Sequence, residues 1–246
     1  MSGEDDWRAL RAFTPARVAL GRAGNGLPTR RVLEFQLAHA RARDAVTMAF
    51  DAEAVAGALA AICVTTRAAD RTAYLSDPDL GRRLSDEGRA RLTHGAFDAA
   101  LVIADGLSSA AVHAHGAALA RHILAASAEL KWAPVTVVTH GRVAIGDDIA
   151  QALGAAFAVV LIGERPGLSA ADSIGIYLTH RPLPGVTTDA ERNCISNVRP
   201  GGLGLPDAAL RLAWLIGQAR RLGATGVALK EDAPERPAIP DGGAGD

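Results

Sequence analysis

Apolar positions in the first part of the chain recur at helical spacing. In the stretch from Thr29 to Val46, a row of residues three or four apart falls on one face, and arginines occupy the other face. This row consists of Val32, Phe35, His39, Ala42 and Val46. Further helical patterns cover 51–63 and 78–84, and Ser85 begins another short one. The sequence therefore predicts a region that is helical up to residue 95.

The pattern changes at Phe97, where short runs of Val, Ile, Leu and Ala begin to alternate with helical stretches. Strands are predicted at 99–105, 135–140, 157–164 and 174–180, with a weaker fifth at 226–230. Predicted helices cover 107–130, 146–154 and 206–222. Strands that alternate with helices form parallel βαβ units. The connection RPGLSAADS after the third strand is too short for a parallel crossover, so the fourth strand is expected to be antiparallel.

These elements predict an α/β fold, with a Rossmann-like mixed and mostly parallel sheet flanked by helices and preceded by a helical N-terminal region. We expect four parts, namely a flexible N-terminus (1–13), the helical region (14–95), the α/β domain (96–230) and a tail (231–246). The tail is rich in Pro, Gly and acidic residues, a composition typical of disorder.

Composition excludes several classes of protein. The chain has 246 residues, 49% of them hydrophobic and 22% charged, as in globular proteins. Its net charge of −1 gives no basis for binding nucleic acid or an anionic membrane surface. No apolar run approaches the roughly 20 residues that cross a bilayer. The two cysteines, Cys63 and Cys194, do not form a disulfide framework and indicate the reducing cytoplasm.

Polar residues follow each of the first three predicted strands. Asp105-Gly106 ends the first strand, His140-Gly141-Arg142-Val143 the second and Gly163-Glu164-Arg165-Pro166-Gly167 the third. If these strands are parallel neighbours, the three tips meet at the edge where α/β sheets bind ligands. The polar stretch 187–206 is predicted to be a long functional loop.

A serine hydrolase is the alternative function. Gly106-Leu107-Ser108-Ser109-Ala110 follows a strand and precedes a helix, as in a nucleophile elbow, but Ala110 stands where the second Gly belongs. A helix cap at Ser108 or Ser109 explains the same residues without catalysis.

Other kinds of site have weaker support. A dinucleotide fingerprint does not follow the first strand, and His113 and His115 are spaced for different faces of a helix rather than for a metal ion. Cys194 could be a nucleophile, a residue lining a ligand cleft or a buried thiol, and the sequence nominates no base beside it.

Four strings together resemble the small subunit of ethanolamine ammonia-lyase. They are HARARDAV (39–46), IADGLSSAAV (103–112), IGERPGLSAADSIGIY (162–177) and DAERNCISNVRPGGL (189–203). The resemblance runs in order from about Thr14 to about Lys230. It implies a lyase that uses adenosylcobalamin to convert ethanolamine to acetaldehyde and ammonia by radical chemistry.

The resemblance also implies where the chemistry occurs. Substrate and radical-handling residues of the family lie in a large barrel-shaped subunit, so no catalytic residue and no metal ligand is expected in this chain. The small subunit packs against the large one in a hetero-oligomer and helps to enclose the cobalamin. Cofactor contacts of the family fall on Val143, Glu164 and Cys194 of this sequence.

Three further expectations accompany the resemblance. No His has Asp two places before it, so the Asp-x-His-x-x-Gly motif is absent and the cofactor is expected to keep its own benzimidazole ligand (base-on). The short segment before the common region is expected not to form a leader for a microcompartment, which favours the cytoplasm. The apolar row of the first long helix belongs either to the core or to a subunit interface, and packing on the large subunit is the favoured expectation.

Overall fold

A mixed six-stranded sheet organises the computed structural model, which describes residues 9–14 and 16–230. The strand order is β1-β3-β2-β4-β5-β6. The first four strands in this order are mutually parallel, whereas β5 is antiparallel to β4 and β6 is antiparallel to β5. The strands are β1 (Ile62–Thr65), β2 (Phe97–Ala104), β3 (Thr136–Thr139), β4 (Ala155–Gly163), β5 (Ile174–His180) and β6 (Asn193–Val198).

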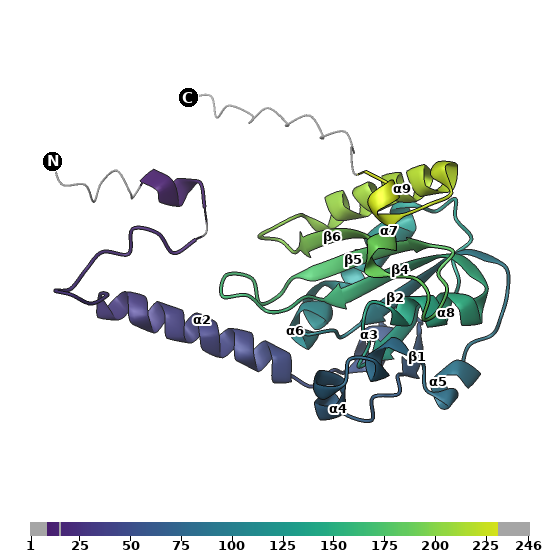
Figure 1. The fold of residues 1–246 in the computed structure, drawn as a ribbon, viewed down its shortest axis with the longest axis horizontal. Coiled ribbons are helices and arrows are strands. Elements are labelled where there is room, and N and C mark those ends of the chain that lie inside the picture. The colour runs from purple at the N-terminus through teal and green to yellow at the C-terminus, as the bar shows by residue number, and fades with distance from the viewer. Residues whose placement is uncertain (1–8, 15, 231–246) are drawn as a thin grey trace.

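Helices surround this sheet (Figure 1). The α-helices are α2 (Thr29–Thr47), α3 (Ala52–Gly57), α4 (Arg71–Ser76), α5 (Asp86–Ala90), α6 (Ser109–Ala111), α7 (Ala117–Ala126), α8 (Ile145–Leu153) and α9 (Leu205–Leu222). A π-helical segment, η3 (Val112–Gly116), joins α6 to α7. Short 3-10 turns are η1 (Leu10–Ala12), η2 (Leu80–Arg82), η4 (Asp189–Glu191) and η5 (Gly226–Ala228).

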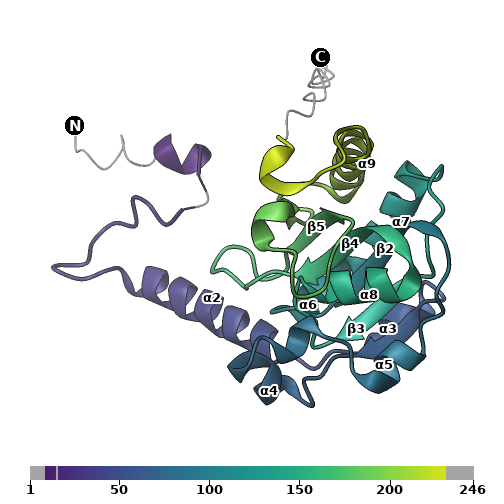
Figure 2. The same cartoon turned by 45° about the vertical axis from the view of Figure 1, so that its right-hand side comes forward.

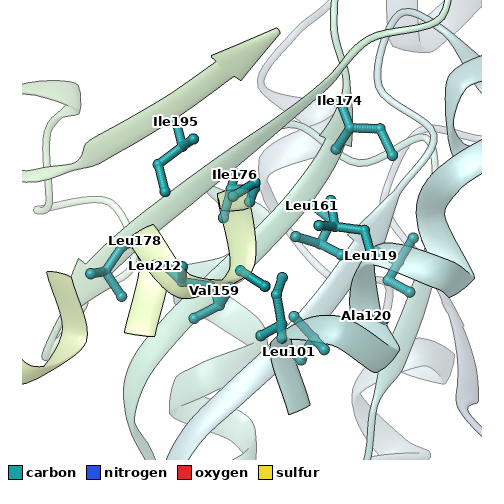
Figure 3. Close-up of a cluster of buried hydrophobic side chains, with 14 of the residues drawn as sticks. Leu101, Leu119, Ala120, Val159, Leu161, Ile174, Ile176, Leu178, Ile195 and Leu212 are labelled. Carbon is teal, nitrogen blue, oxygen red and sulfur yellow. The ribbon is translucent and has the colours of Figure 1, made fainter. Parts of the chain in front are cut away.

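Two hydrophobic cores lie on opposite faces of the sheet, because successive strand residues point to opposite sides. The larger core joins alternate residues of β2, β4, β5 and β6 to α3, α7 and α9, and Figure 3 shows its centre around Leu101, Leu161 and Ile176. The smaller core packs Ile145, Ile149 and other residues of α8 against the other face of β2 and β4. The sheet is therefore buried on both sides at its centre.

The structure confirms the α/β class, the mixed sheet and the antiparallel fourth predicted strand. The strands after which the polar tips were predicted, β2, β3 and β4, are parallel and β2 lies between the other two. Three of the five strand pairings are parallel, so the sheet is more evenly mixed than "mostly parallel" suggests.

Several element predictions were wrong. Residues before 95 are not all helical, because Ile62–Thr65 form β1 beside β3, and the predicted helix at 51–63 ends at Gly57. The predicted helix at 78–84 is reduced to the 3-10 turn η2, and no individual helix was predicted at the position of α4. Segments of four to six residues carry too little periodicity to distinguish helix from strand.

Two further errors concern the C-terminal third. The predicted loop at 187–206 contains β6, an edge strand that pairs with β5 and directs Ile195 and Val198 to the core. The weak fifth strand at 226–230 is instead the turn η5, where Gly226 has a positive φ of 75°. In both places neighbouring elements outweigh the local propensity.

Some predictions fall on residues outside the described ranges. The predicted disordered tail, 231–246, lies wholly outside them, and so do residues 1–8 of the predicted flexible N-terminus. Within the described ranges, none of the helices is long and apolar enough to cross a membrane.

Candidate functional site

Asp105, at the end of β2, links the polar tips that follow β2 and β3. Its side chain is buried, and Oδ1 accepts a hydrogen bond from the backbone N–H of Gly141 at 3.1 Å. Oδ2 lies 2.9 Å from Nη1 of Arg71, in α4. Arg71 also donates to the carbonyl oxygens of Gly106 and Val46, the latter near the end of α2. Asp105 and Arg71 therefore hold four segments of the chain together at this edge of the sheet.

Burial governs the protonation of Asp105. Removal from water raises the pKa of its carboxyl, and the charge of Arg71 with hydrogen bonds from the Gly141 and Gly106 amides acts in the opposite direction. Both oxygens of the Asp105 carboxylate already have partners within the protein, which indicates a structural role.

Tyr74 packs against the segment that follows β3. Two arginines contact its ring, with the guanidinium carbon of Arg142 at 4.1 Å and that of Arg71 at 4.8 Å from the ring centroid. Its hydroxyl donates to the Gly141 carbonyl oxygen at 3.2 Å, and its ring stacks on His140. Burial raises the pKa of Tyr74 to about 12, so the phenol stays neutral at physiological pH.

The tip after β4 presents Glu164. Gly106 and Gly163 let the β2 and β4 tips approach closely, and the Leu107 N–H donates to the Gly163 carbonyl oxygen at 2.9 Å. The Glu164 carboxylate accepts from the backbone N–H of Asn197, with oxygens at 3.3 and 3.2 Å from the nitrogen. Asn197 has a positive φ of 57°, a conformation that Asn tolerates better than most residues. Glu164 is therefore held to the end of β6.

Cys194 lies on β6 directly opposite Tyr177 of β5, which in turn lies opposite Val160 of β4. Directly paired residues point to the same face, and Val160 belongs to the core beneath α8. Cys194 is exposed on that face. Burial raises the pKa of the Tyr177 hydroxyl, and the neighbouring Cys194 raises it further. The Tyr177 and Cys194 side chains therefore lie side by side on the same face of strands β5 and β6.

A cavity of about 420 Å³ lies where these tips meet. The structure brings Val143 and Glu164 together in its lining and places Cys194 next to Tyr177, which also lines it. The residues that line it are Tyr74, Gly106, Leu107, Arg142, Val143, Ile162, Gly163, Glu164, Arg165 and Tyr177. Hydrogen-bonding groups and aromatic surfaces around such a hollow suit part of a large polar ligand.

Sequence reasoning missed several of these residues. Tyr74 lies in a stretch that showed no helical signal, and Asn197 was assigned to a loop. Tyr177 carried a usable signal, because alternation in IGIYLTH places it on the face opposite the aliphatic residues.

The segment that leads into β6 is fixed by a buried ion pair. Arg192 donates from Nη1 and Nη2 to the two carboxylate oxygens of Asp147, in α8, each at 2.7 Å. Arg192 Nη1 also donates to the Thr179 hydroxyl at 3.0 Å. Burial raises the pKa of Asp147, while the hydrogen bonds from Arg192 oppose that change. This pair positions Cys194, two residues further along the chain.

Ser108 is committed to the backbone. Its Oγ accepts from the Ala111 N–H at 3.2 Å and donates to the Ala171 carbonyl oxygen at 2.8 Å, and the side chain is fully buried. These contacts confirm the helix cap. None of the hydrogen bonds within the described residues joins Ser108 to a histidine, so the geometry of a serine hydrolase is absent there.

No group of three or more His, Cys, Asp or Glu side chains among residues 9–14 and 16–230 could hold a metal ion. The arrangement offers donors, acceptors and aromatic faces, which are suited to binding and positioning.

Comparison with known proteins gives a consistent result. A sequence model of the family described as ethanolamine ammonia-lyase light chain matches residues 4–230. An ethanolamine ammonia-lyase small subunit from Xanthomonas campestris pv. campestris is 50% identical over 248 residues, with 96% of this chain and 90% of the relative covered. One from Bradyrhizobium diazoefficiens is 51% identical over 238 residues, with 92% of this chain and 91% of the relative covered. One from Ralstonia nicotianae is 50% identical over 244 residues, with 94% of this chain and 90% of the relative covered.

Proposed function

The chain belongs to the family of ethanolamine ammonia-lyase small subunits, and from this membership we propose that it closes the adenosylcobalamin site of a two-subunit lyase. The reaction is the conversion of ethanolamine to acetaldehyde and ammonia. The observation that carries the proposal is structural. Two of the three family contact positions, Val143 and Glu164, line one cavity, and the third, Cys194, adjoins Tyr177 in the same lining.

The donor set fits the edge of a cobalamin. Neutral amides surround the corrin, so a carboxylate such as Glu164 can accept hydrogen bonds from their N–H groups. Only one backbone N–H, that of Asn197, occupies the Glu164 carboxylate among the hydrogen bonds of the described residues, which leaves lone pairs available. When bound, adenosylcobalamin supplies radical chemistry through its cobalt–carbon bond. Val143, Glu164 and Cys194 would orient the cofactor and exclude water from its edge.

Catalysis itself belongs, in this proposal, to a large subunit that binds ethanolamine. The present chain contributes binding residues and no catalytic residue, and the two chains form a hetero-oligomer. The cofactor keeps its benzimidazole ligand, and the complex resides in the cytoplasm. Residence in an ethanolamine-utilisation microcompartment is the less favoured alternative.

Glu164→Gln is the direct test of the cofactor site. In the assembled pair of subunits, we expect this variant to bind cobalamin about tenfold or more weakly, because an amide accepts hydrogen bonds less strongly than a carboxylate. The affinity is measured by spectroscopic titration with hydroxocobalamin. Glu87→Gln, an exposed carboxylate change on α5, serves as the control. Equal affinities in intact Glu164→Gln and wild-type complexes would refute a role of Glu164 in binding.

Helix α2 is the proposed contact with the large subunit. It extends away from the sheet (Figures 1 and 2), and Ala45 is its one buried residue. Large apolar side chains stay exposed along and beside it, namely Leu27, Val32, Leu33, Phe35, Leu37 and Met48. A helix with this much exposed apolar surface indicates an interface.

Phe35→Asp is expected to reduce recovery of the complex. Phe35 is 45% exposed and stacks on His39. If association buries this position, a carboxylate there would lose its hydration, which weakens binding. Recovery of the tagged large subunit with each variant gives the measurement. Gln36→Asp introduces the same charge at the next, exposed position and is the matched control. Undiminished co-purification of Phe35→Asp would contradict the assignment of α2 to the interface.

A further inference from the structure

We propose that Arg142 is an additional cofactor-binding residue, one that binds the phosphodiester of the cobalamin nucleotide loop. The inference rests on the proposed function and adds a specific anion site to it. Arg142 directly precedes Val143 and lines the same cavity as Glu164.

Unused hydrogen-bonding capacity is the first observation. A guanidinium carries five N–H donors. Within the described residues, the side chain of Arg142 makes one hydrogen bond, from Nη2 to the Tyr74 carbonyl oxygen at 2.9 Å. Its Nε is enclosed by protein atoms, so the donors left for a ligand are those of Nη1 and the second N–H of Nη2, which make no hydrogen bond in the same part of the chain. Because Arg142 lines the cavity, these free Nη donors can reach a ligand there that accepts hydrogen bonds.

Charge balance is the second observation. Other arginines near the site have carboxylate partners, such as Arg71 with Asp105 and Arg192 with Asp147. Arg142 has no such ion pair among the residues described. The cavity lining carries two arginines, Arg142 and Arg165, against one carboxylate, Glu164, and this excess of positive charge favours an anionic group of the ligand.

Rigidity is the third observation. The guanidinium lies 4.1 Å from the centroid of the Tyr74 ring, and the backbone N–H of Arg142 donates to the Gly81 carbonyl oxygen at 2.8 Å. A Cβ at Gly81 would lie 2.9 Å from Cγ of Arg142, so Gly81 provides the space that this side chain occupies. A guanidinium held in one plane loses little entropy when it binds a ligand.

The chemistry of the cofactor identifies the group. Its corrin periphery bears neutral amides, whereas its nucleotide loop contains a single anionic phosphodiester. Planar guanidinium groups bind phosphate oxygens through two parallel N–H bonds. Arg142 and Glu164 would then have complementary tasks, since Arg142 donates to the phosphate and Glu164 accepts from an amide.

Cobinamide provides the test, because it keeps the corrin and its amides but lacks the phosphate, ribose and base. The assembled subunit pair is titrated spectroscopically with hydroxocobalamin and with cobinamide, in buffer without inorganic phosphate. We expect Arg142→Gln to weaken cobalamin binding by about 10- to 100-fold and to change cobinamide affinity by less than about twofold. Arg142→Lys keeps the charge but lacks the planar pair of N–H donors, so it should lose less cobalamin affinity than Arg142→Gln.

Lys131→Gln, at the opposite end of the sheet beside Phe97, is the matched control and should leave both affinities unchanged. Parallel losses for cobalamin and cobinamide in Arg142→Gln would overturn the inference, because they would show a contact with the corrin or a damaged site. Unchanged cobalamin affinity would overturn it as well. If the wild-type pair bound neither compound, the proposed function would fail, and the inference would fail with it.

Discussion

Replacing Gly163 by Ala is expected to destabilise the fold by about 3 kcal/mol, the upper part of the usual range for overpacking, and to weaken cobalamin binding by the complex. A Cβ at this position would lie 2.6 Å from the carbonyl oxygen of Asp105 and closer still to that of Ser108. Both obstacles are backbone atoms, which cannot rotate away. The tips after β2 and β4 would have to separate, and Glu164, the next residue, would move with its strand.

Gly167→Ala is the matched control in the same segment. The nearest atom to a Cβ there is the Ala170 carbonyl oxygen at 3.5 Å, an ordinary contact, so we expect a change within about 0.5 kcal/mol. Chemical denaturation of each variant gives the free energy of unfolding, and titration of the assembled pair gives the cofactor affinity. Equal stability and affinity of the two variants would show that the close approach at Gly163 is unimportant.

Replacing Arg192 by Met is expected to lower the free energy of unfolding by about 3–5 kcal/mol, because it leaves the Asp147 carboxylate buried without its partner. The double replacement Arg192→Met with Asp147→Leu removes both charges and is expected to cost less than the single change. Denaturant titration of the two single variants and the double variant measures this coupling. Additive costs would contradict an energetic link between α8 and the segment before β6.

The Arg192→Met effect should also depend on pH. Burial raises the pKa of Asp147, and the variant lacks the hydrogen bonds that oppose this change. An acid with a folded-state pKa above its unfolded value of about 3.9 stabilises less as pH rises between the two values. The deficit relative to wild type should therefore be smaller at about pH 5 than at about pH 8. A deficit independent of pH would indicate that lost packing, and not the unpaired carboxylate, is responsible.

The sequence predicted the central strands and their consequence for the site. β4 and the second half of β2 are continuous apolar runs, and the short link after β4 correctly indicated an antiparallel β5. Parallel neighbours then brought Asp105, the 140–143 tip and Glu164 to one edge. The prediction succeeded for central strands because a strand that is buried on both faces needs apolar residues at nearly every position, which is easy to recognise in a sequence.

The rest of the site depends on tertiary contacts that leave little trace in the sequence. β1 is four residues long, and β6 is an edge strand with mostly polar side chains. Arg71, Tyr74 and Asn197 reach the site through contacts with segments from 33 to 67 residues away, as with Arg71–Gly106 and Tyr74–Gly141. Such pairings are set by the folded arrangement and not by local propensity. The three proposed cofactor contacts came from the family resemblance, because the sequence pattern alone could not single them out.

Turnover of ethanolamine with adenosylcobalamin is the decisive measurement of whether this chain is a subunit of a cobalamin-dependent lyase. This chain is assayed with a co-expressed large subunit, each chain is assayed alone, and the pair is assayed without cofactor. We expect acetaldehyde and ammonia from the complete pair with cofactor and from none of the other mixtures. Absence of turnover in a demonstrably assembled, cofactor-loaded pair, or turnover by this chain alone, would contradict this assignment.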